Sequence, residues 1–282
     1  MAPIVKFVEL TGPVTLPYVE QGDPSGVPVV LLHGYADSWR AFDLVLPHLP
    51  SSIHAFALTQ RGHADASRPA TGYGSRDFAA DLAAFIDTLS LERPVIVGAS
   101  SGGFVARRFA IDHPERTRGL VLLGSPAALS NKPGVLDLWN STVSKLHDPI
   151  DEAFVRAFQQ GTLARPVPPA FLEAMVQDNL KAPARVWKAT FEGLLDDDSL
   201  AELHKIKAPT LVIWGDRDAI IPRSDQEVLT GAIAGSRLVV YAGAGHTLYW
   251  EEPERVAADL VAFVQGLTAL GDRSLRAAPP HA

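Results

Sequence analysis

Short apolar runs recur along the chain and predict eight β-strands. From Val29 onward most of these runs are nearly continuous in apolar residues, as is typical of strands that are covered on both faces. The first two runs are short and close together, which favours an antiparallel hairpin at the entry to the sheet. The predicted strands are Val5–Leu10, Thr15–Glu20, Val29–Leu32, His54–Leu58, Val95–Gly98, Leu120–Gly124, Thr210–Trp214 and Arg237–Tyr241.

Helical patterns lie between the predicted strands. The segment Ser75–Leu89 carries its large apolar side chains on one helical face. Pro253 can occupy the first turn of a closing helix whose apolar positions also share one face. Strands that alternate with helices predict an α/β fold with a mostly parallel sheet and helices on both of its faces.

The alternation stops after the predicted strand that ends at Gly124. Between residues 128 and 205 no run is typical of a strand, whereas several proline and aspartate positions indicate helix starts. These positions are Asp148-Pro149, Pro168-Pro169, Pro183 and Asp196/Asp197, and Gly161 indicates a helix end. We therefore predict a core domain formed by residues 1–126 and 206–270, an inserted helical cap over residues 127–205, and a disordered tail over residues 271–282.

The segment Gly98-Ala99-Ser100-Ser101-Gly102 joins a predicted strand to a predicted helix. A glycine-x-serine-x-glycine pattern in this context is the nucleophile-elbow motif, in which a sharp turn exposes the central serine. The turn strains the backbone of Ser100 and crowds the positions two residues away, so Gly98 and Gly102 dispense with side chains. The helix that follows also directs free N–H groups toward a reacting carbonyl group. The alternative is a turn that only packs closely or binds phosphate.

Other polar side chains also follow predicted strands. His33-Gly34 comes after the third strand, and Asp216 and Asp218 come after the seventh. His246 follows the eighth strand after an Ala-Gly-Ala-Gly turn. Because the carboxyl ends of parallel strands meet at one edge of a sheet, we expect these groups at the same edge as Ser100.

These segments together resemble the α/β-hydrolase superfamily, in particular its capped branch with a serine nucleophile. The chain order Ser100, Asp218 and His246 is the order of the catalytic triad in that family. The resemblance favours Asp218 over Asp216, because the family's acid usually lies three residues after a glycine and shortly before a proline. It implies an α/β-hydrolase fold with an eight-stranded sheet, in which the inserted helices roof the active site.

The resemblance also implies that the oxyanion hole consists of backbone groups. It assigns this role to the N–H groups of Tyr35, in the His-Gly-x segment, and Ser101, which follows the nucleophile. The imidazole of His33 is then left with a structural role. His63 lies in a loop that also resembles the family, and we expect it to be structural because His246 already supplies the base.

Composition and charge exclude several other classes of protein. The 282 residues carry a net charge of -7, which disfavours a nucleic-acid surface, and contain no cysteine. The first residues lack the pattern of a signal peptide, and no apolar run approaches the roughly 18 residues that span a membrane. We find neither metal-ligand spacing nor a dinucleotide-binding glycine loop. We therefore expect a cytoplasmic monomer or homodimer that needs no metal or organic cofactor and binds neither nucleic acid nor membrane.

Large apolar side chains in the predicted cap indicate how a substrate could be held. Three pairs with i, i+4 spacing share a helix face, namely Phe154/Phe158, Phe171/Met175 and Trp187/Phe191. Such pairs either pack the cap on the core or line an apolar pocket, and the sequence leaves both possibilities open. The candidate substrate contacts are Trp39, Trp139, Phe158, Trp187 and Leu248. A covered apolar pocket fits a small apolar carbonyl substrate.

We therefore expect a serine hydrolase that cleaves a small carboxylic ester or lactone through an acyl-enzyme. A serine nucleophile departs from the aspartate of epoxide hydrolases and haloalkane dehalogenases in the same superfamily. One alternative is a C–C bond hydrolase or a cofactor-free perhydrolase with the same triad, although the Gly-Pro-Gly-rich run typical of C–C hydrolases is absent after His33-Gly34. An alternative of another class is a non-catalytic receptor for a small ligand.

Overall fold

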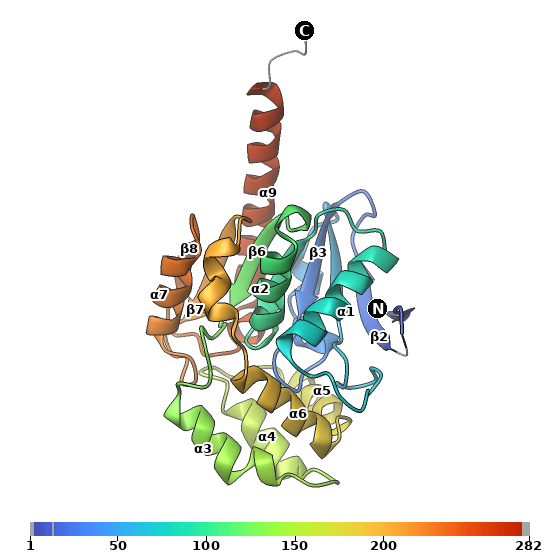
Figure 1. Ribbon diagram of the computed structural model, residues 1–282, viewed down its shortest axis with the longest axis vertical. Coiled ribbons are helices and arrows are strands. Elements are labelled where there is room, and N and C mark those ends of the chain that lie inside the picture. The colour runs from blue at the N-terminus through green and yellow to red at the C-terminus, as the bar shows by residue number, and fades with distance from the viewer. Residues whose placement is uncertain (1–2, 13, 278–282) are drawn as a thin grey trace.

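Eight strands form one sheet in the order β1-β2-β4-β3-β5-β6-β7-β8 in the computed structural model, which describes residues 3–12 and 14–277 (Figure 1). The strands are β1 (Val5–Glu9), β2 (Thr15–Gln21), β3 (Val27–Leu32), β4 (Ile53–Leu58), β5 (Val95–Ala99), β6 (Gly119–Leu123), β7 (Thr210–Gly215) and β8 (Arg237–Tyr241). Strand β2 pairs with β1 and with β4 in antiparallel orientation, and the remaining neighbouring pairs are parallel. The predicted mostly parallel eight-stranded sheet and its antiparallel entry hairpin are confirmed.

Helices cover both faces of the sheet. Neighbouring residues of a strand point to opposite faces, so Val30 of β3 belongs to one hydrophobic cluster and Leu31 to another. The helices of the core are α1 (Ser75–Thr88), α2 (Gly102–Asp112), α7 (Arg223–Ala232), α8 (Leu248–Glu251) and α9 (Pro253–Ala277), with 3-10 helices η1 (Trp39–Phe42), η2 (Leu46–His48) and η3 (Pro114–Arg116). Side chains of α1 and α2 complete the first cluster, and those of α8 and α9 complete the second.

Helix α9 is longer than the sequence predicted. We expected a disordered tail over residues 271–282, but the helix continues to Ala277, and residues 278–282 lie outside the described part of the chain. Figure 1 shows the last turns of α9 projecting beyond the sheet. Within residues 3–12 and 14–277, no helix has the length and apolarity needed to cross a membrane.

The segment between β6 and β7, which we call the cap, is helical and lies at the side of the sheet opposite the projecting end of α9 (Figure 1). Its helices are α3 (Pro133–Ser141), α4 (Glu152–Gln160), α5 (Pro169–Leu180) and α6 (Ala184–Leu195), with 3-10 helices η4 (Val143–Lys145) and η5 (Ser199–Lys205). Helix α4 does not begin at Asp148-Pro149 as predicted, because Asp151 caps it by accepting the N–H of Ala153 at 3.0 Å. The carboxylate of Asp148 instead accepts the N–H of Ala184 at 2.8 Å, in the first turn of α6.

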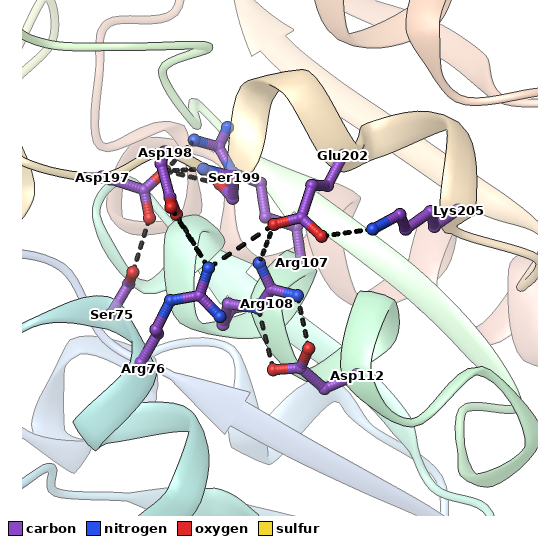
Figure 2. Close-up of polar contacts among 10 residues, drawn as sticks. All are labelled: Ser75, Arg76, Arg107, Arg108, Asp112, Asp197, Asp198, Ser199, Glu202 and Lys205. Carbon is purple, nitrogen blue, oxygen red and sulfur yellow. Dashed lines mark hydrogen bonds and ion pairs between the residues drawn. The ribbon is translucent and has the colours of Figure 1, made fainter.

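A buried arginine links the core to both ends of the cap. Arg107 in α2 donates to the carbonyl oxygens of Pro126 and Ala127 at 2.8 and 2.9 Å, where the cap begins. It also donates to the side chains of Asp197 at 3.0 Å and Ser199 at 2.7 Å, where the cap ends. Figure 2 shows Arg107, Asp197 and Ser199 within a wider polar network that joins α1, α2 and η5. Both junctions of the insertion are therefore held against the same helix.

Candidate active site

The turn between β5 and α2 holds Ser100 in a backbone conformation that residues with side chains rarely adopt. Its φ angle is +49°, and its N–H donates to the carbonyl oxygen of Leu123 at 2.8 Å. A β-carbon on Gly98 would lie 2.5 Å from the carbonyl oxygen of Gly102, and one on Gly102 would lie 2.5 Å from that of His33. Both positions therefore require glycine, because any side chain would collide with the backbone.

His246 connects the serine to an acid. Its Nε2 lies 2.8 Å from the Oγ of Ser100, and its Nδ1 lies 2.8 Å from the Oδ2 of Asp218. An ionised carboxylate can only accept, so Nδ1 carries the proton and Nε2 can accept the hydroxyl proton of the serine. The backbone N–H of His246 donates to the carbonyl oxygen of Thr162 at 3.0 Å, so a cap residue helps to fix the ring. The three side chains form one continuous chain of hydrogen bonds.

The two aspartates after β7 have different partners. The fully buried carboxylate of Asp218 accepts the N–H groups of Ile220 and Ile221, each at 2.8 Å, through the oxygen that does not face the imidazole. The carboxylate of Asp216 accepts the N–H of Gly243 at 2.6 Å. Asp218 is thus fixed against the imidazole, whereas Asp216 braces the loop that follows β8.

Two backbone N–H groups beside the serine are available to a ligand. Within residues 3–12 and 14–277, neither the N–H of Tyr35 nor that of Ser101 donates a hydrogen bond. The backbone before Tyr35 lies against Ser100, since a β-carbon on Gly34 would be 3.3 Å from the Cβ of Ser100. The hydroxyl of Tyr35 donates to the carbonyl oxygen of Trp187 at 2.7 Å, so the side chain of Tyr35 is tied to the cap.

Two further histidines near the site have structural partners. The Nε2 of His33 accepts the N–H of Gln60 at 2.9 Å, and its Nδ1 donates to the carbonyl oxygen of Gly34 at 2.8 Å. The ring of His63 lies edge-on to that of His33, with 5.0 Å between the centroids. Burial lowers the pKa of His33 well below its usual range and lowers the pKa of His63 to about 4. Both rings are therefore neutral near pH 7.

A cavity of about 800 Å³ lies between the cap and the core, and Ser100, Ser101 and His246 line it. The apolar side chains in its wall come mostly from the cap and from the loop after β7. They include Leu129, Val135, Leu138, Phe158, Phe191, Leu194, Ile220 and Ile221. Neither in this cavity nor in the rest of the described chain is a group of three or more histidine, aspartate or glutamate side chains arranged to hold a metal ion.

The cavity wall differs from the substrate contacts that the sequence suggested. The structure brings Phe158 to the wall. Three other candidates lie in the hydrophobic core instead: Trp39, Trp187 and Leu248. Trp139 stacks on Phe191 at 5.6 Å between ring centroids, and of these two rings Phe191 lines the cavity. Helical spacing identified a common face for Trp187 and Phe191, but it did not show that Tyr35 packs edge-on against Trp187 at 5.2 Å.

Several lining residues were missed from the sequence. Ile220 and Ile221 form an apolar pair in the loop shortly after Asp218, and such a pair beside a predicted site residue is a signal of a pocket wall. Asp37 and Tyr249 also line the cavity, and no local pattern marks either of them.

Comparison with known proteins identifies the family. A family model described as alpha/beta hydrolase fold matches residues 27–253. The chain belongs to the α/β-hydrolase family. The AB hydrolase superfamily protein YisY of Bacillus subtilis (strain 168) is 30% identical over 250 residues, which are 84% of this chain and 91% of that protein. The 2-hydroxymuconate semialdehyde hydrolase of Pseudomonas sp. (strain CF600) is 31% identical over 246 residues, which are 83% of this chain and 84% of that protein.

A solved structure of similar fold agrees with this assignment. The esterase EaEST from Exiguobacterium antarcticum has a TM-score of 0.83 and 25% sequence identity, over 93% of this chain and 100% of that chain. The predicted α/β-hydrolase fold is confirmed, and the relatives support a hydrolase.

Proposed function

We propose that this α/β-hydrolase is a serine hydrolase that cleaves a small carboxylic ester or lactone through an acyl-enzyme. The observation that carries the proposal is the continuous hydrogen-bonded chain from Asp218 through His246 to Ser100, which ends at the cavity. A serine at a strained turn, an imidazole in the correct tautomer and a buried carboxylate together meet the requirements for an activated nucleophile.

The proposed reaction uses only groups of this chain and water. His246 takes the proton of Ser100 as the serine oxygen attacks the carbonyl carbon, and Asp218 stabilises the imidazolium that forms. The N–H groups of Tyr35 and Ser101 donate to the oxyanion. The imidazolium then protonates the leaving alkoxide, which departs as an alcohol or, for a lactone, stays attached to the acyl group. Water, deprotonated by the same imidazole, hydrolyses the acyl-enzyme.

The shape of the cavity supports a small substrate. A cavity of about 800 Å³ with mostly apolar walls suits a short ester or lactone better than a peptide or polysaccharide chain. The structural neighbour from Exiguobacterium antarcticum is an esterase, which agrees with an ester substrate. We retain the proposal that the protein acts in the cytoplasm as a monomer or homodimer and requires no cofactor.

A C–C bond hydrolase with the same triad is the second candidate, and the 2-hydroxymuconate semialdehyde hydrolase of Pseudomonas sp. (strain CF600), which is 31% identical, is a reason to include dienone acids in the test. The same triad would serve this reaction. The segment after His33-Gly34, Tyr-Ala-Asp-Ser-Trp, lacks the Gly-Pro-Gly-rich run expected of such enzymes. A non-catalytic receptor on this fold is an outcome of the test below, and peroxide-dependent halide oxidation would distinguish a perhydrolase.

The test is covalent labelling followed by a substrate panel. A small fluorophosphonate should add one adduct to the wild-type protein, seen by intact-protein mass spectrometry, and none to Ser100→Ala. Ser101→Ala is the matched control and should still be labelled, since that residue contributes its backbone N–H. Short esters and γ-lactones should then be hydrolysed faster than dienone acids. A wild-type protein that is not labelled and hydrolyses neither esters nor lactones would refute the proposal and favour a receptor, whereas preferred cleavage of dienone acids would favour the C–C hydrolase.

A further inference from the structure

One part of the cavity lining is polar and lies outside the triad. Its side chains come from the loop after β3, from α4 and the loop that follows it, and from the segment after His246. We call this group the polar lining, and its residues are Asp37, Gln159, Thr162, Thr247 and Tyr249. Most of these groups bond to each other or to the cap. Thr162 and Thr247, for example, lie 3.0 Å apart through their hydroxyl oxygens.

Asp37 is held through one carboxylate oxygen and free at the other. Its Oδ1 accepts from the side-chain amides of Gln159 at 2.8 Å and Asn179 at 3.5 Å. Among the described residues no group donates to its Oδ2. That atom lies 3.4 Å from the position of a β-carbon built on Gly34, and the Cβ of Ser100 lies 3.3 Å from the same position. The free carboxylate oxygen and the nucleophile therefore border the same small space.

Tyr249 supplies a donor that is also without a partner. Its ring stacks on Phe42 at 5.5 Å between centroids, and the residue is fully buried. Six buried side-chain atoms lack a hydrogen-bond partner in the described part of the chain, and the Tyr249 hydroxyl is the one whose residue lines the cavity. Burial, together with the nearby carboxylates of Asp37 and Asp218, raises the pKa of Tyr249 well above its usual range. The hydroxyl therefore keeps its proton and can donate it.

We propose that Asp37 and Tyr249 bind a hydroxyl group of the substrate, close to the carbonyl group that Ser100 attacks. This inference rests on the proposed function. A hydroxyl group accepts one hydrogen bond and donates another, so it complements the phenol and the carboxylate at the same time. An apolar substituent would leave both groups unpaired, and a carboxylate would be repelled by Asp37 and Asp218. The preferred substrates are therefore hydroxylated esters rather than plain ones.

The protonation behaviour of Asp37 is compatible with this ligand. Burial raises the pKa of Asp37 to about 7, against the opposing effect of the amides of Gln159 and Asn179 and of the nearby His246. A hydroxyl group can donate to the ionised acid and accept from the protonated acid. Binding of a hydroxyl group is thus possible on both sides of neutral pH.

The hydroxyl group could belong to the acyl part or to the alcohol part of the ester, and matched substrate pairs distinguish the two. In the acyl arm, methyl 3-hydroxybutyrate is compared with methyl butyrate. In the alcohol arm, 2-hydroxyethyl butyrate is compared with propyl butyrate. The readout is the ratio of kcat/KM within each pair. We expect this ratio to be about tenfold in favour of the hydroxylated ester in one arm.

Two variants and a control test whether the named residues cause the preference. Asp37→Asn keeps an oxygen for Gln159 but replaces the free acceptor, and Tyr249→Phe keeps the ring that stacks on Phe42. Each should reduce the ratio toward one, and any general loss of activity cancels because the ratio is measured within one variant. Leu138→Ala changes the apolar wall and should leave the ratio unchanged.

The outcomes separate this inference from the proposed function. If Ser100 is labelled by the fluorophosphonate but the ratio is near one in both arms, or survives both variants, the hydroxyl subsite is wrong and the serine hydrolase stands. If Ser100 is not labelled and none of the four esters is hydrolysed, both proposals fail.

Discussion

Replacing Arg107 with methionine tests whether one buried side chain secures both ends of the cap. Methionine has a similar length but no donors, so the carbonyl oxygens of Pro126 and Ala127 lose their side-chain partner. The carboxylate of Asp197 loses its buried cation at the same time. We expect a large loss of stability, because an unpaired buried charge costs more than the pair contributes when intact.

The magnitude follows from the burial and from the remaining partners. The side chains of Arg107 and Asp197 are 0% and 1% exposed, and removing one member of such a pair costs about 3–5 kcal/mol. Asp197 keeps hydrogen bonds from the hydroxyl of Ser75 at 2.5 Å and from the N–H of Ser199 at 3.1 Å, so we expect the lower end, about 3 kcal/mol. For a chain of this size that corresponds to a fall in Tm of about 6–12 °C.

The assay is urea unfolding followed by tryptophan fluorescence, with a thermal scan beside it. Arg76→Met is the control, because Arg76 belongs to the same network (Figure 2) but its side chain is 58% exposed and pairs with an exposed Asp198. That variant should lose less than about 0.5 kcal/mol. Adding Asp197→Asn to Arg107→Met should recover part of the loss, since it removes the unpaired charge. If Arg107→Met costs no more than Arg76→Met, the reasoning is refuted.

Three other predictions concern the elbow, the acid and the effect of pH. Gly98→Ala should abolish fluorophosphonate labelling and lower the urea midpoint, because its β-carbon would lie 2.5 Å from a backbone oxygen; unchanged labelling would contradict the crowding argument. Asp218→Asn should lower kcat by about 10⁴-fold while Asp216→Asn lowers it less than tenfold, measured on the best ester found, and equal losses would show that the acid is misassigned. Burial lowers the pKa of His63 to about 4, whereas in the unfolded chain the pKa of this histidine is about 6.5. Between pH 6.5 and 4 the unfolded chain therefore binds a proton at His63 that the folded chain does not bind. Up to about 3 kcal/mol of the free energy of unfolding should be lost over this range. Urea midpoints across that range should fall less steeply in His63→Gln, and identical slopes would rule out His63 as the source.

The sheet could be predicted because its central strands are buried on both faces. A strand such as β5 has every residue buried, so its sequence is a continuous apolar run bounded by polar turns. The elbow around Ser100 could also be predicted from the sequence, because steric crowding allows only glycine at positions 98 and 102. The positions of Asp218 and His246, each in a loop that follows a predicted strand, then indicated that they are partners of Ser100.

The contents of the cavity could not be predicted in the same way. Helical spacing placed Trp187 and Phe191 on one face, and the ring of Tyr35, from a distant loop, packs edge-on against both. Of the two, only Phe191 lines the cavity, which the spacing did not indicate. Asp37 follows the His33-Gly34 segment and Tyr249 follows His246, but only tertiary packing brings the two side chains to the same cavity, and the sequence does not show this. The sequence predicted that Asp148 starts the next helix, α4. Its carboxylate instead caps α6, which begins 36 residues later in the chain.

The bond from the N–H of His246 to the carbonyl oxygen of Thr162 bears on any attempt to redesign substrate preference by exchanging caps. The loop that contains Thr162 fits closely on the histidine loop, since a β-carbon on Gly245 would lie 2.5 Å from the backbone nitrogen of Ala164. A transplanted cap that brought its own sequence through residues 161–165 would displace His246, the proposed general base, along with the cavity walls. Grafts confined to α3 or α6 would change the cavity wall and leave His246 in place, so the boundaries of a useful exchange lie inside the insertion rather than at its ends.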